Sequence, residues 1–357
     1  MAAAAAALLA APAAAGAAAR GGAWAAFYAD DNGVKVFSSA LTARVEVPGG
    51  LVLEGAYETD VVTGASVDAV SSASYKEWTE VRHGLRLGAS WSRDGREVGV
   101  AYLPSFEPDY VSQGFSAHAG AEWLDRRLGT RLVGGYSRDL VFGLAPIRTA
   151  WGRAELSAVL DARTLATLSY ELGWQAGYIS SPYLWVEIEL VDPPPAGERI
   201  AHLRDTLPGA RTRHALVAGL RRALGAGWFA SGSYRFYLDD WGIKSHTGEA
   251  ELAHTFAGGR VTLAALARLY GQSGARFWSD HYVARLTALP ALFTTDKLLS
   301  PLWSGALGAR SETTFPLGGA TLVVTTRLEL YAQRFLDYSP LDWRRAVIGS
   351  VGVALEL

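Results

Sequence analysis

Histidine and serine are the residues of this chain best suited to nucleophilic chemistry, but their spacing matches no catalytic motif. The histidines are scattered along the chain: His83, His118, His202, His214, His246, His254 and His281. No G-x-S-x-G segment marks a nucleophile on a sharp turn. A lipase built on a barrel would need Ser and His on its outer face, where the pattern described below places His83 and His254. We predict that the protein is not an enzyme, and a barrel-borne hydrolase is the weakest alternative.

Carboxylates gather near the start of the chain, and hard cations such as Ca²⁺ bind several carboxylate and carbonyl oxygens. The acidic residues concerned are Asp30, Asp31, Glu58, Asp60 and Asp68. Their spacing is not that of a regular calcium loop, and Asp and Asn also cap tight turns beside glycines such as Gly33 and Gly64. No two histidines have the H-E-x-x-H spacing of a zinc site. We predict turn capping here, with no metal and no cofactor.

Two further groups combine aromatic and acidic residues: Asp239-Asp240-Trp241, and Asp280-His281 beside Phe277 and Trp278. Both are expected at strand ends. They could line an external binding mouth, but aromatic residues with polar loop neighbours are also what a membrane-boundary girdle contains. We favour the girdle.

The elements that must carry these residues are long amphipathic strands. Residues 164–175 read T-L-A-T-L-S-Y-E-L-G-W-Q, with one apolar and one polar face in strict alternation. A period of two is typical of a β-strand. This segment is longer than the five or six residues or so usual in soluble strands and reaches the roughly 9–11 that cross a bilayer. Tyr170 and Trp174 end the apolar face, as at a membrane–water boundary.

The same alternation recurs along nearly the whole chain. It is clearest in residues 51–62, 80–92, 114–124, 228–239, 321–333 and 347–357. A β-propeller would require an internal repeat of about 40–50 residues, which the sequence lacks. The pattern predicts an all-β protein, a transmembrane antiparallel up-and-down β-barrel of about 16 strands, with 14 as the lower count.

The expected connections are of two kinds, as in bacterial barrels with short periplasmic turns and longer external loops. Tight turns include 48–50, 94–96 and 225–227, and the long segments are 63–79, 177–212 and 271–295. The alternation of short and long fails near 271–300, where residues 277–286 are either an extra strand or part of a loop. Residues 23–32 either cross the barrel wall or pack in its mouth.

The polar faces are rich in Arg and Glu and poor in Lys. In a barrel this face lines the lumen, where both signs of charge must balance in a confined space. Ordinary ion pairs on a water-exposed soluble sheet are the alternative. The predicted lumen-lining residues are Glu58, Arg82, Arg86, Glu122, Arg131, Arg153, Glu155, Glu171, Arg235, Glu249, Glu251, Arg310, Glu312, Arg327 and Glu329.

Composition limits the remaining possibilities. Lys and Arg number 33 against 35 Asp and Glu, so no basic surplus suggests a nucleic-acid partner. No run of about 18 apolar residues predicts a membrane helix after the first residues. Residues 1–19 are Ala-rich and predict a signal peptide with a small-x-small site before Arg20, although the usual basic start is missing and a low-complexity tail is the alternative. Residues 20–357 are predicted to form one barrel domain.

Two segments near the start resemble a known family. Residues 28–34 read Y-A-D-D-N-G-V and residues 57–69 read Y-E-T-D-V-V-T-G-A-S-V-D-A. They resemble the aromatic-x-D-D-N and D-V-V-S-G-A-S-P-D-like segments of the domain-of-unknown-function 3570 family, with Thr63 and Val67 in place of Ser and Pro. The matching residues are Asp30, Asp31, Asn32, Asp60, Gly64, Ser66 and Asp68. The resemblance implies an outer-membrane barrel of a Gram-negative bacterium and implies no activity.

Two roles remain open for such a barrel, which outer-membrane lipid would surround. It could be a pore or channel for small polar solutes or ions, because an empty barrel of this size leaves an aqueous channel. It could instead be a scaffold for an envelope protein partner, with side chains occluding the lumen. The size of the barrel favours the pore, whereas the crowded charges of the polar faces favour an occluded lumen.

Overall fold

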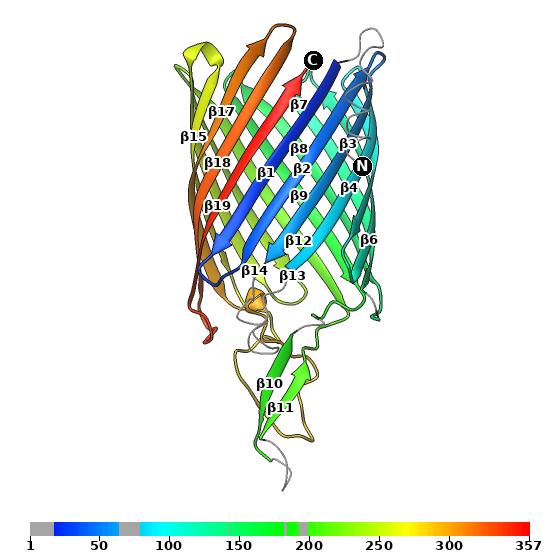
Figure 1. Ribbon diagram of the computed structural model, residues 1–357, viewed down its shortest axis with the longest axis vertical. Helices are drawn as coiled ribbons and strands as arrows, with labels where there is room; N and C mark the ends of the chain where they lie inside the picture. Colours follow the sequence, from blue (N-terminus) through cyan, green and yellow to red (C-terminus); the bar gives the residue numbers. More distant parts are fainter. Residues whose placement is uncertain (1–17, 64–78, 142, 182–183, 193–198) are drawn as a thin grey trace.

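Sixteen antiparallel strands close into one barrel in the computed structural model, which describes residues 18–63, 79–141, 143–181, 184–192 and 199–357 (Figure 1). Each strand pairs with its neighbours in chain order, and β12 follows β9 around the wall because β10 and β11 lie outside it. The barrel strands are β1 (Ala18–Asp30), β2 (Lys35–Val47), β3 (Leu51–Thr63), β4 (Thr79–Arg93), β5 (Arg96–Phe106), β6 (Tyr110–Trp123), β7 (Leu128–Val141), β8 (Ile147–Asp161), β9 (Thr164–Ala176), β12 (Ala210–Gly225), β13 (Trp228–Asp239), β14 (Lys244–Phe256), β15 (Val261–Gln272), β17 (Leu302–Leu317), β18 (Ala320–Phe335) and β19 (Trp343–Glu356). The predicted fold class and the count of 16 are confirmed.

The first and last strands close the barrel. β1 pairs antiparallel with β19 from Arg20 beside Glu356 to Asp30 beside Ala346, and its other edge pairs with β2. Residues 23–30 are therefore part of the wall, which decides the question of whether they pack in the mouth. The strand begins at Ala18, so the last two residues of the expected signal peptide lie within it, while residues 1–17 are outside the described part of the chain.

The connections differ in length at the two ends of the barrel. At the upper end in Figure 1, where β19 ends, short turns join β2 to β3, β4 to β5 and β17 to β18. The turn at 48–50 depends on glycine: Gly50 has a φ of +88°, and a Cβ there would lie 2.1 Å from the carbonyl oxygen of Ser92. Because short turns face the periplasm in bacterial barrels, the opposite end is external.

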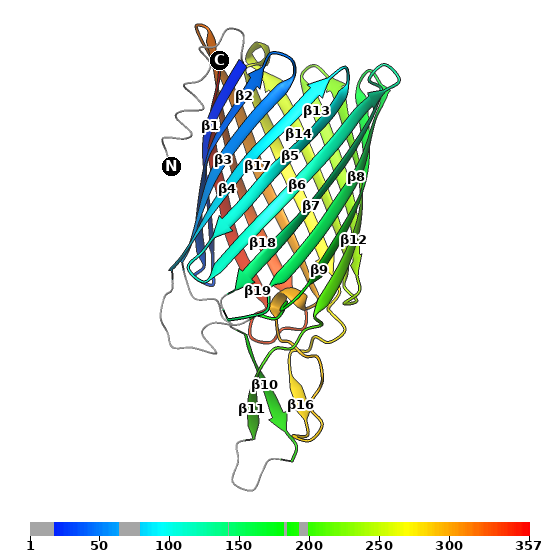
Figure 2. The ribbon, with the colours of Figure 1, turned by 90° about the vertical axis from the view of Figure 1, so that its right-hand side faces the viewer.

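The external end carries a small second sheet. β10 (Trp185–Leu190) pairs antiparallel with β11 (Ile200–Arg204) and parallel with β16 (Tyr282–Ala284), and these strands project beyond the barrel (Figure 2). β10 and β11 belong to the connection from β9 to β12, and β16 to the connection from β15 to β17. Residues 277–286 are therefore a loop containing one short strand, and they add no strand to the barrel.

Apolar side chains bind this external sheet and its supporting loops together. Val186 and Ile188 are fully buried and pack with Phe293. A second cluster, around Trp241 and Leu299, packs the segment after β13 against the 3₁₀ turn η3 (Lys297–Leu299). Another 3₁₀ turn, η2 (Ala257–Gly259), joins β14 to β15 at the opposite end of the barrel. We call the two external connections, residues 177–209 and 273–301, the external cap.

Alternation along each strand separates two faces of the wall. Leu168, Tyr170 and Leu172 of β9 are each between 43% and 46% exposed, while Ser169 between them is buried. Neighbouring strands continue the exposed apolar face, with Leu307 beside Leu330. A barrel in lipid needs an apolar outer surface. It must also be closed, because lipid cannot satisfy the hydrogen bonds of an unpaired strand edge. Among the described residues, no helix has the length and apolarity needed to span a bilayer.

The outer face can be tested by placing a charge on it. Leu307 is 67% exposed on the bare protein surface, and we expect Leu307→Arg to destabilise the folded barrel in lipid vesicles by about 2–4 kcal/mol if it lies near the bilayer midplane. Urea unfolding would measure this. Thr325→Arg is the matched control, because Thr325 borders an inner hollow of the barrel. Equal destabilisation by the two variants would contradict the assignment of faces.

Candidate functional site

Arginine–glutamate pairs run around the inner face of the wall. Arg153 Nη2 lies 2.6 Å from Glu155 Oε2, and its Nη1 lies 3.9 Å from Glu171 Oε1 on the next strand. Arg235 then reaches the other oxygen of Glu171 at 3.2 Å. Charges on β8, β9 and β13 are therefore linked, and each carboxylate oxygen of Glu171 faces a different guanidinium. Opposite charges thus neutralise one another locally in this part of the wall.

Several of these pairs bridge strands that are not neighbours. Arg131 on β7 lies 3.5 Å from Glu97 on β5, and Gly120 of β6 is in register with both. Arg310 on β17 likewise lies 2.8 Å from Glu251 on β14, across β15. Between Glu97 and Arg131 the intervening strand presents only Gly120, which leaves room for the two long side chains to meet.

Most of the other predicted lining residues form pairs within the wall, and two lie near the ends of the barrel. Arg86 pairs with Glu54, Arg268 with Glu249, and Arg327 with Glu329, all between or along strands of the wall. Glu312 approaches Arg310, and Glu58 borders an inner hollow. Glu122 pairs with Arg126 in a short periplasmic turn, and Arg82 lies beside Glu107 of an external loop.

The inner face encloses two hollows large enough for small solutes. One, of about 760 Å³, is bounded by residues from β1 to β4 and from β17 to β19, including Glu58 and Arg86. The other, of about 500 Å³, is bounded by seven consecutive strands from β9 to β18, including Arg268 and Glu329. A single space touching seven neighbouring strands lies on the concave side of the wall. Charged side chains therefore border open space inside the barrel.

The N-terminal motif residues that the structure describes cap a turn. Asp30 Oδ1 accepts hydrogen bonds from the backbone N–H groups of Asn32 at 3.0 Å and Val34 at 2.9 Å. Asp31 Oδ1 accepts from the backbone N–H of Arg345 at 2.9 Å, and Gly33 supplies a φ of +84°. Backbone donors therefore occupy one oxygen of each of these two carboxylates. Asp60 lies 3.9 Å from Arg82, whereas Gly64, Ser66 and Asp68 lie outside the described residues.

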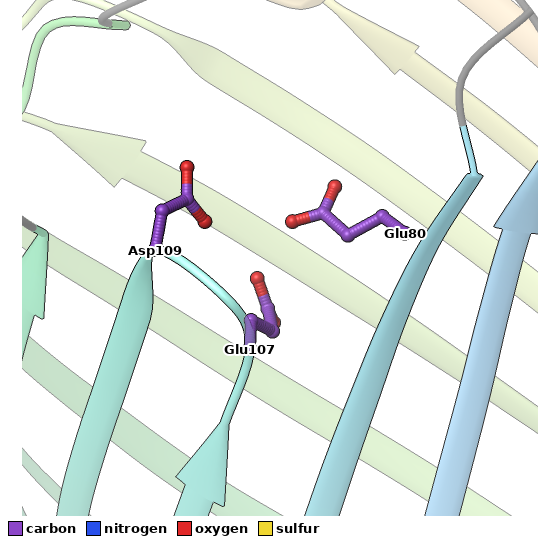
Figure 3. Close-up of side chains that lie close together, drawn as sticks. All are labelled: Glu80, Glu107 and Asp109. Atoms are coloured by element: carbon purple, nitrogen blue, oxygen red, sulfur yellow. The ribbon is translucent and has the colours of Figure 1, made fainter.

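Three carboxylates converge at the external end of β4 and in the loop from β5 to β6 (Figure 3). One oxygen each of Glu80, Glu107 and Asp109 lies within 4.8 Å of the others. Burial raises the pKa of Glu107 to about 7, and the hydrogen bond to Glu80 and the charges of Glu80 and Asp109 act in the same direction, while Arg82 opposes them. The cluster therefore holds a proton near neutral pH. Sequence reasoning missed it because these residues meet only after the strands pair.

A buried ion pair between β12 and β13 supports Trp241, which packs against Ala275 and Leu299 of the external cap. Asp239 is completely buried; its Oδ2 accepts from Arg211 at 2.5 Å and from the hydroxyl of Tyr237 at 2.7 Å. Its Oδ1 accepts from the backbone N–H of Ile243 at 2.9 Å. The Arg211 guanidinium stacks 4.3 Å from the ring of Trp241. The Asp239-Asp240-Trp241 segment thus stabilises the cap, and the girdle assignment for it is replaced by this anchoring role.

Histidines on the outer face contact aromatic residues. His83 Nδ1 lies 2.8 Å from the hydroxyl of Tyr57, and the ring of His254 packs against those of Trp228 and Phe256. The same Tyr–His arrangement recurs at Tyr170–His214 and Tyr234–His246. Amphipathic rings of this kind suit a membrane boundary. The two histidines considered for a hydrolase are thus members of aromatic pairs.

Comparison with known proteins identifies the family. The family model described as "Protein of unknown function (DUF3570)" matches residues 148–339, more than half of the chain. The chain belongs to this family. The matched region starts after the two N-terminal segments that suggested the resemblance, so it supports the assignment independently of them. No curated protein matches the chain.

Solved structures share the barrel fold at low identity. A bacterial polysaccharide outer membrane secretin aligns with a TM-score of 0.53 and 8% identity, covering 96% of this chain and 98% of its own. The siderophore receptor PirA of Pseudomonas aeruginosa gives 0.46 and 12%, covering 94% of this chain, which spans only 61% of the receptor. The CymD monoaromatic hydrocarbon channel gives 0.46 and 9%, with 94% and 88% covered. Together with its apolar outer face, the closed barrel places this family member in the outer membrane.

The shared proton near Glu107 predicts a pH-dependent stability. The folded pKa of about 7 is above the ordinary 4.5, so the folded barrel binds this proton more tightly than the unfolded chain does. The resulting stabilisation is complete below about pH 4.5 and is lost as the pH rises to about 7. Urea midpoints should therefore fall between about pH 5 and pH 8 less in Glu107→Gln than in the wild type. Glu122→Gln, at the other end of the barrel, should keep the wild-type pH dependence. If Glu107→Gln also shows the wild-type pH dependence, Glu107 is not the group that holds the proton.

Loss of the buried anchor should loosen the cap and spare the barrel. Removing one partner of a buried ion pair costs about 3–5 kcal/mol because the other charge is left unpaired. We expect Asp239→Ala to increase proteolytic cleavage within residues 177–209 and 273–301 while heat-modifiable migration on a gel stays normal. Asp240→Ala is the matched control, since Asp240 holds Arg276 through its backbone carbonyl. Indistinguishable cleavage in the two variants would show that Asp239 is not the anchor.

Proposed function

We propose that this outer-membrane barrel is a pore for small polar solutes or ions. The observation that carries the proposal is the exposure of its inner charges. The side chains of Arg268 and Glu249 are 52% and 55% exposed although they lie 3.4 Å apart on the inner face. Exposed charges on the concave face favour a water-filled interior, because removing a charge from water is costly. A barrel of this strand number is wide enough to leave one.

The paired charges define what such a pore would pass. Arginine and glutamate alternate around the wall, so no single sign dominates the inner surface near Arg153, Glu171 and Arg235. A lining of this kind offers hydrogen bonds and local charges to polar solutes without strongly excluding either ion type. The long ion-paired side chains also narrow the passage. We therefore infer small solutes as the cargo and modest ion selectivity.

A scaffold with an occluded lumen is the second candidate, and one observation favours it. The external cap packs apolar residues around Trp241 and Leu299 at the barrel's external end, where a solute would enter. If the cap seals the mouth, the barrel would hold an envelope partner instead of conducting. This candidate predicts an inserted barrel without conductance and a protein that co-purifies with it from membranes.

Single-channel recording in a planar bilayer tests the pore. The refolded barrel, checked by heat-modifiable migration, should give stable conductance steps. Arg268→Gln leaves the negative charge of Glu249 unpaired, so the reversal potential in a salt gradient should show greater cation selectivity. Glu249→Gln should show greater anion selectivity. Leu330→Ala on the outer face is the control and should change neither conductance nor selectivity. An inserted barrel that gives no conductance would contradict the pore proposal and favour the scaffold with a co-purifying partner.

A further inference from the structure

The external sheet brings two histidines to either side of one glutamate. On β10, Glu187 is directly opposite His202 of β11. On the other edge, the parallel register sets Ile188 beside Tyr282 of β16, so His281, one residue earlier, lies next to Glu187. Three neighbouring backbone segments thus place a His, a Glu and a His in one row, although these residues are far apart in the sequence.

All these side chains belong to the outward face of the sheet. Alternation along β10 turns Val186 and Ile188 into the apolar cluster, where both are fully buried. Glu187 and Glu189 therefore project from the opposite face, and their side chains are 61% and 57% exposed. His202 and His281 are exposed to a similar degree, at 52% and 64%. The four side chains of the row are therefore accessible from the external medium and are not part of the apolar core.

The donor atoms are already close in pairs. His202 Nδ1 lies 3.7 Å from Glu187 Oε1, and His281 Nε2 lies 3.3 Å from Glu189 Oε2. Two donors bound to one Zn²⁺ at about 2.0–2.2 Å in tetrahedral geometry are separated by roughly 3.3 Å. The His281–Glu189 pair has this spacing, and the His202–Glu187 pair exceeds it by a few tenths of an ångström. All four side chains project from one face of the sheet, and one ion would be bound by both pairs once rotation of these exposed side chains brings the pairs together.

The donor set selects a class of ion. Two imidazole nitrogens and two carboxylate oxygens suit borderline transition metals, whereas Ca²⁺ and Mg²⁺ take oxygen ligands. Two carboxylates with two neutral imidazoles also carry the charge that balances a divalent cation. We propose that the row formed by Glu187, Glu189, His202 and His281 binds a divalent transition-metal ion such as Zn²⁺ on the external surface. The proposal does not depend on conduction through the barrel.

Isothermal titration of the refolded, untagged full chain with Zn²⁺ tests the site. We expect about one equivalent bound per chain at neutral pH. The double variant His202→Ala, His281→Ala should weaken this binding by about tenfold or more, because removing even a residue that only orients a metal ligand costs about 10–100-fold. The control is His83→Ala, His246→Ala, which removes two histidines of the barrel wall that pair with tyrosines and should bind as the wild type does.

Further measurements separate a built site from general surface binding. Glu187→Gln, Glu189→Gln should also weaken Zn²⁺ binding while migration on a gel shows a folded barrel. Affinity should drop on acidification from about pH 7.5 to about pH 5.5, because protons compete for imidazole nitrogens. Ca²⁺ should give no heat that depends on the two histidines. Equal Zn²⁺ affinity in the wild type and the double variant would overturn the proposal, as would equal losses in the double variant and the control.

Discussion

The hydrogen-bonded closure of β1 on β19 is the constraint on which the rest of the structure depends. In lipid no water can satisfy an open strand edge, so every backbone group of the wall must find its partner on a neighbouring strand. Pairing from Arg20–Glu356 to Asp30–Ala346 removes the last free edge. Once the wall is closed, each strand has only two faces, and the alternation of its sequence decides which residues meet lipid and which meet the interior.

Closure also brings the charged side chains of the inner face close together, so each charge must be balanced by a neighbouring side chain. The inner face is concave, so side chains from neighbouring strands crowd together and cannot diverge as they would on a convex surface. Pairing opposite charges and placing a small residue such as Gly120 beneath a pair relieve both the crowding and the charge. Arginine suits this role because its planar fork can serve two carboxylates, as Arg153 does with Glu155 and Glu171.

The sequence was sufficient to predict the wall because its signal is local. Alternation in residues 164–175 or 228–239 is visible without knowing any partner strand, and the structure has strands there at almost the same bounds. The external sheet was not predictable, since β16 has three residues and pairs with a segment almost a hundred positions earlier. For the same reason Glu80, Glu107 and Asp109, or Glu187 and its histidines, appear together only after register and topology are fixed.

The barrel wall and the external cap are therefore stabilised by different interactions. Within the bilayer, alternation is enforced at every position, so the inner surface varies only in which charges and small residues it carries. Beyond the bilayer that constraint is lifted, and the cap is held instead by apolar packing around Val186 and Ile188 and by the packing of Trp241 against Leu299. An exposed face supported in this way can change its side chains without cost to the barrel. The exposed residues of the cap can thus vary independently of the wall.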